Sequence, residues 1–280
     1  MIKLACMTLP YANVSLERAL VGIAGAGYLY VAFGLPHAGE EVLDEQDPQA
    51  VSKLKRLFER YKLEPVMLIG TEQLAPGQPI ERTQLRLEAA QALGIKEVLS
   101  LGTWGYREFP DIPIPEAEMV ETNKRFIEKF RRVGSIAESL GITVTIKPHT
   151  GNTATARHIR QTLDEIGCEF IKASYDPGNV RFYEGIDPAA DFPLIADRTV
   201  SIIAKDHSGI RAEHNFPLPG EGEVEFRALF RSWKGAGSAD GTIVVERVDG
   251  TGGPMTTEQI DLRLAQARTN LEGLLHKSGL

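Results

Sequence analysis

Short apolar runs alternate along the chain with longer amphipathic segments, and this alternation constrains the fold more than any other feature. Runs such as Val66–Ile69 and Ile142–Ile146 are apolar and contain β-branched residues, as expected of parallel strands that are buried on both faces. Such strands are expected to begin near Ile2, Tyr28, Leu63, Lys96, Ile142, Phe170, Thr199 and Thr242. Apolar residues at helical spacing predict helices over Ser15–Ala26, Pro48–Tyr61, Ile80–Leu93, Pro115–Leu140, Ala154–Ile166, Glu223–Lys234 and Thr256–His276.

Strands that alternate with helices imply a parallel sheet, and eight of them in regular succession favour a closed α/β barrel of the (β/α)₈ TIM type. Barrels of this kind commonly have the length of this chain, so we expect one domain over residues 1–280. An open doubly wound sheet is the alternative. The usual nucleotide-binding loops, G-x-G-x-x-G and G-x-x-x-x-G-K-[ST], are absent from the sequence. Segments 70–82 and 102–115 are rich in Gly and Pro and read as long loops over the carboxyl ends of the strands.

The net charge and the cysteine content indicate the cellular environment and the classes of partner to expect for this protein. The formal net charge of −7 does not suit binding to a nucleic-acid backbone, which needs clustered Lys and Arg. No apolar stretch reaches the roughly 18 residues of a membrane helix, and the first residues do not resemble a signal peptide. Cys6 and Cys168 form no C-x-x-C pair. We therefore expect a cytoplasmic protein with a small-molecule partner, neither nucleic acid nor membrane, and leave its oligomeric state open, a homo-oligomer included.

Polar residues gather directly after four consecutive late strands. The segments are Lys147-Pro148-His149-Thr150-Gly151-Asn152, Tyr175-Asp176-Pro177-Gly178-Asn179, Lys205-Asp206-His207-Ser208-Gly209 and Glu246-Arg247-Val248-Asp249-Gly250. In a barrel these strand ends are neighbours on one rim, which is where TIM-barrel active sites lie. Side chains alternate along a strand, so His149 is expected to lean the same way as Lys147, and His207 the same way as Lys205.

Each of these residues also has an ordinary structural explanation. A Lys at a strand end is often solvated, an Asp before Pro-Gly is a common turn residue, and His207 could be a loop histidine. Glu246 is harder to explain in this way, because it follows the apolar run Ile243–Val245 and a buried carboxylate needs a partner. Their recurrence at one level on four adjacent strands favours a functional site.

These segments resemble the xylose-isomerase-like superfamily of sugar isomerases, epimerases and related lyases. The resemblance covers most of the chain. Its strongest parts are Tyr175–Asn179, Ala204–Asp206, Pro219-Gly220-Glu221-Gly222-Glu223-Val224-Glu225-Phe226 and Val244–Glu246. The third of these is similar to the family pattern G-E-G-x-[IV]-[DE]-[FW] before the last helix. Together the motifs are specific for the superfamily and say little about the substrate.

The resemblance implies four metal ligands, Glu, Asp, His and Glu, on the fifth to eighth strands. Asp176 and Glu246 match the second and fourth ligands, whereas Lys147 and Ile203 stand where the first Glu and the His are expected. A subset of such barrels is similar in having Lys-Pro-His after the fifth strand. A divalent metal such as Mn or Zn is therefore doubtful, although Asp176 and Glu246 with His149 and His207 would make a donor set that suits either.

The family resemblance implies proton transfer next to a sugar carbonyl through an enediolate, which needs an acid or base and an electrophile. Without a metal, Lys147 would supply the positive charge, with His149 or His207 beside it, and Glu246 or Asp176 would act as base. The leading hypothesis is thus a carbohydrate isomerase or epimerase that is metal-independent or binds metal weakly. The alternatives are a lyase, dehydratase or aldolase that uses Lys147 as a Schiff base, a non-catalytic sugar-binding barrel, and a DNA-repair endonuclease, which the dispersed histidines and acidic charge disfavour.

Substrate contacts are expected from four residues near the same rim: Asn179, Lys205, His207 and Trp104. The aromatic side chains of Trp104, Tyr106, Phe109 and Phe182 form either a wall for one face of a sugar or ordinary packing over the barrel. No phosphate-binding loop is visible, which favours an unphosphorylated ligand. The sequence does not identify the sugar.

Overall fold

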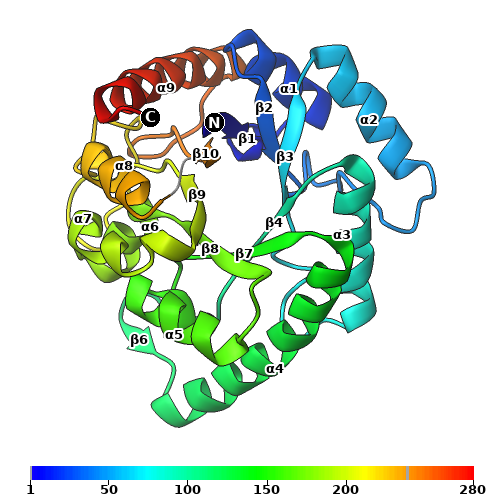
Figure 1. Cartoon of the computed structure of the whole chain (residues 1–280). Helices are drawn as coiled ribbons and strands as arrows, with labels where there is room; N and C mark the ends of the chain where they lie inside the picture. Colours follow the sequence, from blue (N-terminus) through cyan, green and yellow to red (C-terminus); the bar gives the residue numbers. More distant parts are fainter. Residues whose placement is uncertain (1, 238–239) are drawn as a thin grey trace.

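The computed structural model describes residues 2–237 and 240–280 and contains a closed barrel of eight parallel strands in the order β1, β10, β9, β8, β7, β4, β3, β2 (Figure 1). The strands are β1 Ile2–Met7, β2 Tyr30–Phe33, β3 Glu64–Ile69, β4 Glu97–Leu101, β7 Thr143–Lys147, β8 Ile171–Tyr175, β9 Thr199–Ile203 and β10 Gly241–Val245. The closed barrel confirms the predicted fold and excludes the open sheet. The largest error in a strand start is at β2, expected at Tyr28 and observed at Tyr30.

The long helices lie around the outside of the barrel (Figure 1). They are α1 Leu16–Gly25, α2 Ala50–Tyr61, α3 Ile80–Leu93, α4 Glu116–Leu140, α5 Ala156–Ile166, α8 Phe226–Gly235 and α9 Thr257–Ser278. Their ends follow local chemistry. Ser15 caps α1 by accepting a hydrogen bond from the Arg18 backbone N–H, and Gly94 ends α3 with a positive φ of 81° that favours glycine. No described helix is both long and apolar enough to span a membrane.

Several short helices and strands were not predicted, because they have too few residues to show a hydrophobic period. Segment 102–115, expected to be a loop, contains a small antiparallel pair of strands, β5 Tyr106–Glu108 and β6 Ile112–Pro113. Two short helices, α6 Pro177–Asn179 and α7 Pro188–Asp191, follow β8. The hairpin and α6 both lie beyond the carboxyl ends of barrel strands, so they shape the rim rather than the core.

The barrel interior is layered, and a polar layer lies near its amino-terminal end. The Glu97 carboxylate accepts hydrogen bonds from the hydroxyls of Thr145 (2.9 Å) and Ser201 (2.6 Å), and Ser201 also contacts Ser174. Two residues farther along the strands, apolar side chains that include Leu99, Ile203 and Val244 fill the interior. A second, larger apolar cluster joins the outer faces of the strands to the helices. The rigid interior places the next layer of side chains at the carboxyl-terminal rim.

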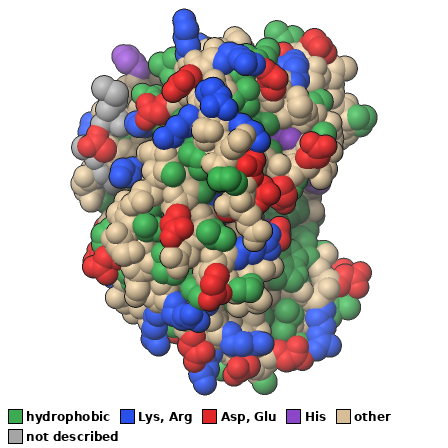
Figure 2. Space-filling model, turned by 90° about the vertical axis from the view of Figure 1, so that its right-hand side faces the viewer, with side chains coloured by type: hydrophobic (Ala, Val, Ile, Leu, Met, Phe, Trp, Pro, Cys, Tyr) green, Lys and Arg blue, Asp and Glu red, His purple; other side chains and the backbone are tan. Residues whose placement is uncertain are grey.

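Acidic and basic side chains are interspersed over the face that Figure 2 shows. The view contains no continuous basic surface of the kind that a nucleic-acid backbone requires.

Candidate active site

Four buried charged side chains meet at the carboxyl-terminal end of the barrel, and we call them the quartet: Lys147, Asp176, Lys205 and Glu246. The Lys147 Nζ atom lies 2.8 Å from Glu246 Oε2 and 3.0 Å from Asp176 Oδ2. The Lys205 Nζ atom lies 2.9 Å from each of the same two oxygens. Two ammonium groups and two carboxylates thus alternate around one point and balance in formal charge.

The period of the strands explains why these four residues converge. Lys147 is two residues beyond Thr145, and Asp176 is two residues beyond Ser174, both of which face the barrel interior. Glu246 likewise lies two residues beyond the interior residue Val244. Because alternate residues point to one side of a strand, all four side chains of the quartet point to the inside of the barrel, each beyond a residue that faces the interior. Lys205 follows Ile203 by the same spacing, so this isoleucine lies beneath the quartet.

The Asp-Pro-Gly-Asn motif positions both Asp176 and Lys205. Asp176 caps α6 by accepting from the Asn179 backbone N–H at 2.9 Å. The Asn179 amide accepts from Lys205 Nζ at 2.8 Å and donates to the Pro148 carbonyl at 2.7 Å. A Cβ atom on Gly178 would lie 2.6 Å from the Lys205 side chain and 2.7 Å from its carbonyl oxygen. Any larger residue at position 178 would clash with Lys205, so this position requires glycine.

The charges within the quartet keep Lys147 and Glu246 ionised. Burial lowers the pKa of Lys147, but the charges of Glu246 and Asp176 raise it more, so the pKa lies above its ordinary value. Burial raises the pKa of Glu246, but Lys147 and Lys205 lower it more, so the pKa lies well below its ordinary value. Lys147 is therefore an ammonium and Glu246 a carboxylate at neutral pH.

A cavity of about 310 Å³ opens above the quartet, and a histidine–tyrosine pair lies on its wall. The Tyr183 hydroxyl and His149 Nε2 are 2.9 Å apart. Burial and the charges of Lys147 and Lys205 lower the pKa of His149 to about 3, and burial raises the pKa of Tyr183 to about 12. Both groups are thus neutral hydrogen-bonding groups at pH 7. His149 leans toward Lys147 as expected, whereas Tyr183 was not singled out from the sequence.

The other residues expected to contact substrate or to form an aromatic wall do not all line the cavity. Asn179, Lys205 and Phe182 line the cavity. Trp104 is 41% exposed and packs against His149 with ring centroids 5.1 Å apart, so it supports the histidine from the side. Tyr106 and Phe109 pack with Trp104 in the same aromatic group.

His207 is buried and turned away from the cavity lining. Its Nε2 atom lies 2.7 Å from the Glu213 carbonyl oxygen, and its ring packs against Phe182 and Phe216. His207 lies four residues beyond the end of β9 at Ile203, so the strand alternation that still places Lys205 no longer applies to it. Burial lowers the pKa of His207, which keeps the ring neutral inside this packing.

Asp206 holds the Gly-Glu-Gly loop rather than substrate. Its carboxylate accepts hydrogen bonds from the backbone N–H groups of Gly220 (2.8 Å), Gly222 (2.9 Å), Val224 (3.0 Å) and His207 (2.9 Å). A Cβ atom on Gly222 would lie 2.3 Å from the Asp206 carboxylate, so only glycine fits. The loop that carries the family-like motif is thus anchored directly beside Lys205.

The quartet does not fit a divalent metal in the way that the resemblance implies. The two carboxylates that match metal ligands, Asp176 and Glu246, have ammonium nitrogens within 3.0 Å, and these would repel a cation. His149 and His207 do not complete a donor set, because within residues 2–237 and 240–280 no three His, Cys, Asp or Glu side chains converge as metal ligands. Ile203 lies in the apolar layer below.

Comparison with known proteins places this barrel in a family. A xylose isomerase domain protein from Alicyclobacillus acidocaldarius has a similar fold, with 19% identity and a TM-score of 0.76 over the full length of both chains. A D-tagatose 3-epimerase-like protein has 16% identity and a TM-score of 0.74 over 99% of this chain and 98% of that one. The 3-keto-D-glucoside 4-epimerase of E. coli has 16% identity and a TM-score of 0.69 over 96% of this chain and 100% of that one. At these identities the likeness shows the fold. No curated protein matches the sequence. The family model described as xylose isomerase-like TIM barrel matches residues 22–268, and the chain therefore belongs to that family.

Proposed function

We propose that the chain is a carbohydrate isomerase or epimerase that moves a proton on a carbon next to a sugar carbonyl. The observation that carries the proposal is the quartet, a buried and charged site at the rim where TIM-barrel enzymes place their chemistry. The solved structures with the same fold include proteins named as a D-tagatose 3-epimerase-like protein, an L-ribulose 3-epimerase and a 3-keto-D-glucoside 4-epimerase. Such names support sugar chemistry of this kind here.

In this mechanism Lys147 and Lys205 act as the electrophile. The sugar carbonyl oxygen binds to the two ammonium groups, which are fixed in place before the reaction by Asp176 and Asn179. Positive charge that is already oriented in a water-poor site stabilises the oxyanion of an enediolate without further reorganisation. The mechanism assigns to this chain's own side chains the charge that the family resemblance would assign to a metal.

Glu246 is the base in the same scheme. A sugar oxygen that accepts hydrogen bonds from Lys147 and Lys205 weakens their hold on Glu246, and the pKa of this carboxylate then rises toward that of a usable base. The proton passes from carbon to the Glu246 carboxylate, and the C–H electron pair moves into the enediolate, whose oxygen becomes negative. Return of that proton from Glu246 to the neighbouring carbon, with transfer of the hydroxyl proton to the former carbonyl oxygen, gives an isomer. Delivery of a proton from water to the other face of the first carbon, while Glu246 gives up its own proton to water, gives an epimer. The neutral His149–Tyr183 pair orients the remaining hydroxyls.

The charged state of Lys147 argues against the Schiff-base alternative. A lysine must be neutral to attack a carbonyl, yet the two carboxylates hold Lys147 as an ammonium. Treatment with borohydride in the presence of D-tagatose should accordingly leave no adduct detectable by mass spectrometry. A trapped adduct on Lys147 would favour aldolase- or dehydratase-like chemistry instead.

The test of the proposed function is exchange of carbon-bound hydrogen with D₂O, followed by NMR for D-tagatose, D-allulose and L-ribulose. The intact protein should exchange the hydrogen next to the carbonyl of at least one of them. Lys147→Met should slow that exchange by roughly 10²–10³-fold, the usual effect of removing one oxyanion-stabilising group. The exposed Lys96 lies at the opposite end of the barrel, so Lys96→Met is the matched control and should leave the rate unchanged.

Binding of these sugars without exchange would instead indicate a sugar-binding barrel. Equal rates for Lys147→Met and the intact protein would show that the lysine is structural. Circular dichroism must accompany the variant, because removing one member of a buried ion pair destabilises a fold by about 3–5 kcal/mol.

A further inference from the structure

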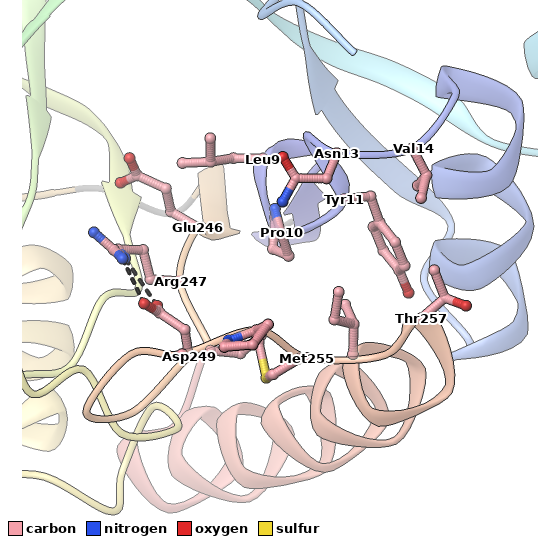
Figure 3. A pocket seen from close by; sticks show the side chains of 14 residues that line it. Leu9, Pro10, Tyr11, Asn13, Val14, Glu246, Arg247, Asp249, Met255 and Thr257 are labelled. Atoms are coloured by element: carbon pink, nitrogen blue, oxygen red, sulfur yellow. Dashed lines mark hydrogen bonds and ion pairs between the residues drawn. The ribbon is translucent and has the colours of Figure 1, made fainter. Parts of the chain in front are cut away.

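A second cavity adjoins the quartet cavity at the same end of the barrel. It has a volume of about 370 Å³ and lies between the loop that follows β1 and the loop that follows β10. The two cavities share Leu9, Glu246 and Arg247 as lining residues. Glu246 and Arg247 stand at one end of the second cavity, and Val14 and Thr257 at the other (Figure 3). A ligand that reaches Glu246 from the quartet can therefore continue into this space.

The second cavity has largely apolar walls. Its apolar lining residues are Leu9, Pro10, Tyr11, Val14, Val248, Pro254, Met255 and Ile260. Polar side chains are fewer, and the charged ones have partners. Arg247 donates to Asp249 at 2.8 Å (Figure 3), and its guanidinium packs over Phe216 at 4.6 Å, while Glu246 is held by Lys147 and Lys205. Such a surface favours an apolar group that carries few hydrogen-bonding atoms.

One wall of the second cavity is held in place by buried contacts of Tyr11. Tyr11 is 1% exposed, and its hydroxyl donates to Asp261, which also binds Arg18 at 2.7 Å. A Cβ atom on Gly22 would lie 2.2 Å from the Tyr11 hydroxyl, so the helix leaves room for this tyrosine. A preformed wall lowers the entropy lost on binding, which is a property of binding sites rather than of gaps between mobile loops.

We propose that the second cavity binds an apolar substituent of the substrate, so that the natural substrate is a sugar conjugate and not a free monosaccharide. This inference rests on the proposed function, which puts the reacting carbonyl at the quartet. Each cavity alone lies near the lower end of the roughly 300–1,000 Å³ usual for small-molecule sites. Both are filled at once only by a molecule with a polar ring on one side of Glu246 and an apolar group on the other.

The test compares the affinities of ketohexose probes that differ only in one ether group. D-Tagatose is substituted on O1 or on O6 with either a methyl or a benzyl group, and dissociation constants are measured by calorimetry. At one of the two positions the benzyl ether should bind at least tenfold more tightly than the methyl ether, because it buries a phenyl ring. Saturation-transfer NMR should show the strongest contact at the benzyl protons.

Variants locate this preference in the second cavity. Met255→Trp fills the cavity from the β10 loop, and Asn13→Trp fills it from the β1 loop, so each should bring the benzyl-to-methyl affinity ratio close to one. Met119 lines a different cavity beside α4, and the matched control Met119→Trp should keep the full ratio.

Three outcomes would overturn the inference: no benzyl preference at either position, no binding of any probe, or a preference that survives both cavity-filling variants. The proposed function is judged separately by hydrogen exchange on unsubstituted sugars. Exchange without a benzyl preference would remove the conjugate and leave the isomerase or epimerase standing.

Discussion

Glu97 should make the stability of the barrel depend on pH in a specific direction. This carboxyl group is buried in the polar layer near the amino-terminal end of the barrel, and burial raises its pKa from 4.5 to about 7. Hydrogen bonds from Ser201 and Thr145 lower the pKa but do not offset the burial. The native state therefore binds a proton that the unfolded state releases near pH 4.5.

The sign and size of the effect follow from this difference. A carboxyl group whose pKa is higher in the folded state stabilises the fold most at low pH, and its contribution is lost as the pH rises through 7. A shift of about 2.5 units corresponds to about 3 kcal/mol, of which about 2.5 kcal/mol is lost between pH 5 and pH 8. Glu97→Gln keeps the shape of the side chain and removes the titration.

Urea unfolding of the intact protein and of Glu97→Gln over pH 5–8 measures this effect. Other titrating groups are common to both proteins and cancel in the difference between their unfolding free energies. That difference should shift by about 2.5 kcal/mol in favour of the Gln variant as the pH rises. A difference that stays constant over this range would mean that Glu97 has the same pKa in both states, and the account of the polar layer would be wrong.

Two further substitutions test how the site is held. Gly178→Ala places a methyl group against Lys205 and should slow hydrogen exchange on the sugar at least tenfold. The control Gly77→Ala, whose added methyl group meets no atom within 4 Å, should leave the rate unchanged. Equal rates for the two variants would show that Lys205 is not held by this contact. Asp206→Asn weakens the charge-assisted hydrogen bonds to the Gly-Glu-Gly loop and should lower the free energy of unfolding in urea by about 1–3 kcal/mol. An unchanged midpoint of urea unfolding would contradict the anchoring role of Asp206.

The fold was predictable from the sequence because its elements are long and periodic. α3 begins and ends at the predicted residues, Ile80 and Leu93, since its apolar spacing and Gly94 mark both the helix and its end. The β5–β6 hairpin was missed because a two-stranded ribbon of this size has no measurable period and depends on tertiary contacts.

The site was predictable only within about two residues of each strand end. Lys147 and His149 line the same cavity, as alternation predicts, and Asp176 and Glu246 contact Lys147. The same rule fails for His207, which lies beyond the end of β9 in irregular backbone. The direct contact of Lys205 with both carboxylates depends on distances across the barrel, which no local pattern encodes.

The structural role of Asp206 also lies outside a local pattern. Its backbone partners Gly220, Gly222 and Val224 are far along the chain, so the motif was visible in the sequence while its anchor was not. Tyr183 was missed for a related reason, because its partner His149 comes from a different strand end.

In the proposed mechanism Lys147 and Lys205, rather than a divalent metal, stabilise the oxyanion. The most direct measurement is hydrogen exchange on the reactive ketose by protein that has been stripped with a chelator, with and without added Mn²⁺ or Zn²⁺. Because two ammonium groups already contact Asp176 and Glu246, the stripped protein should retain its full exchange rate, and added metal should not raise it. Loss of exchange on stripping and its recovery with one equivalent of Mn²⁺ or Zn²⁺ would contradict the account.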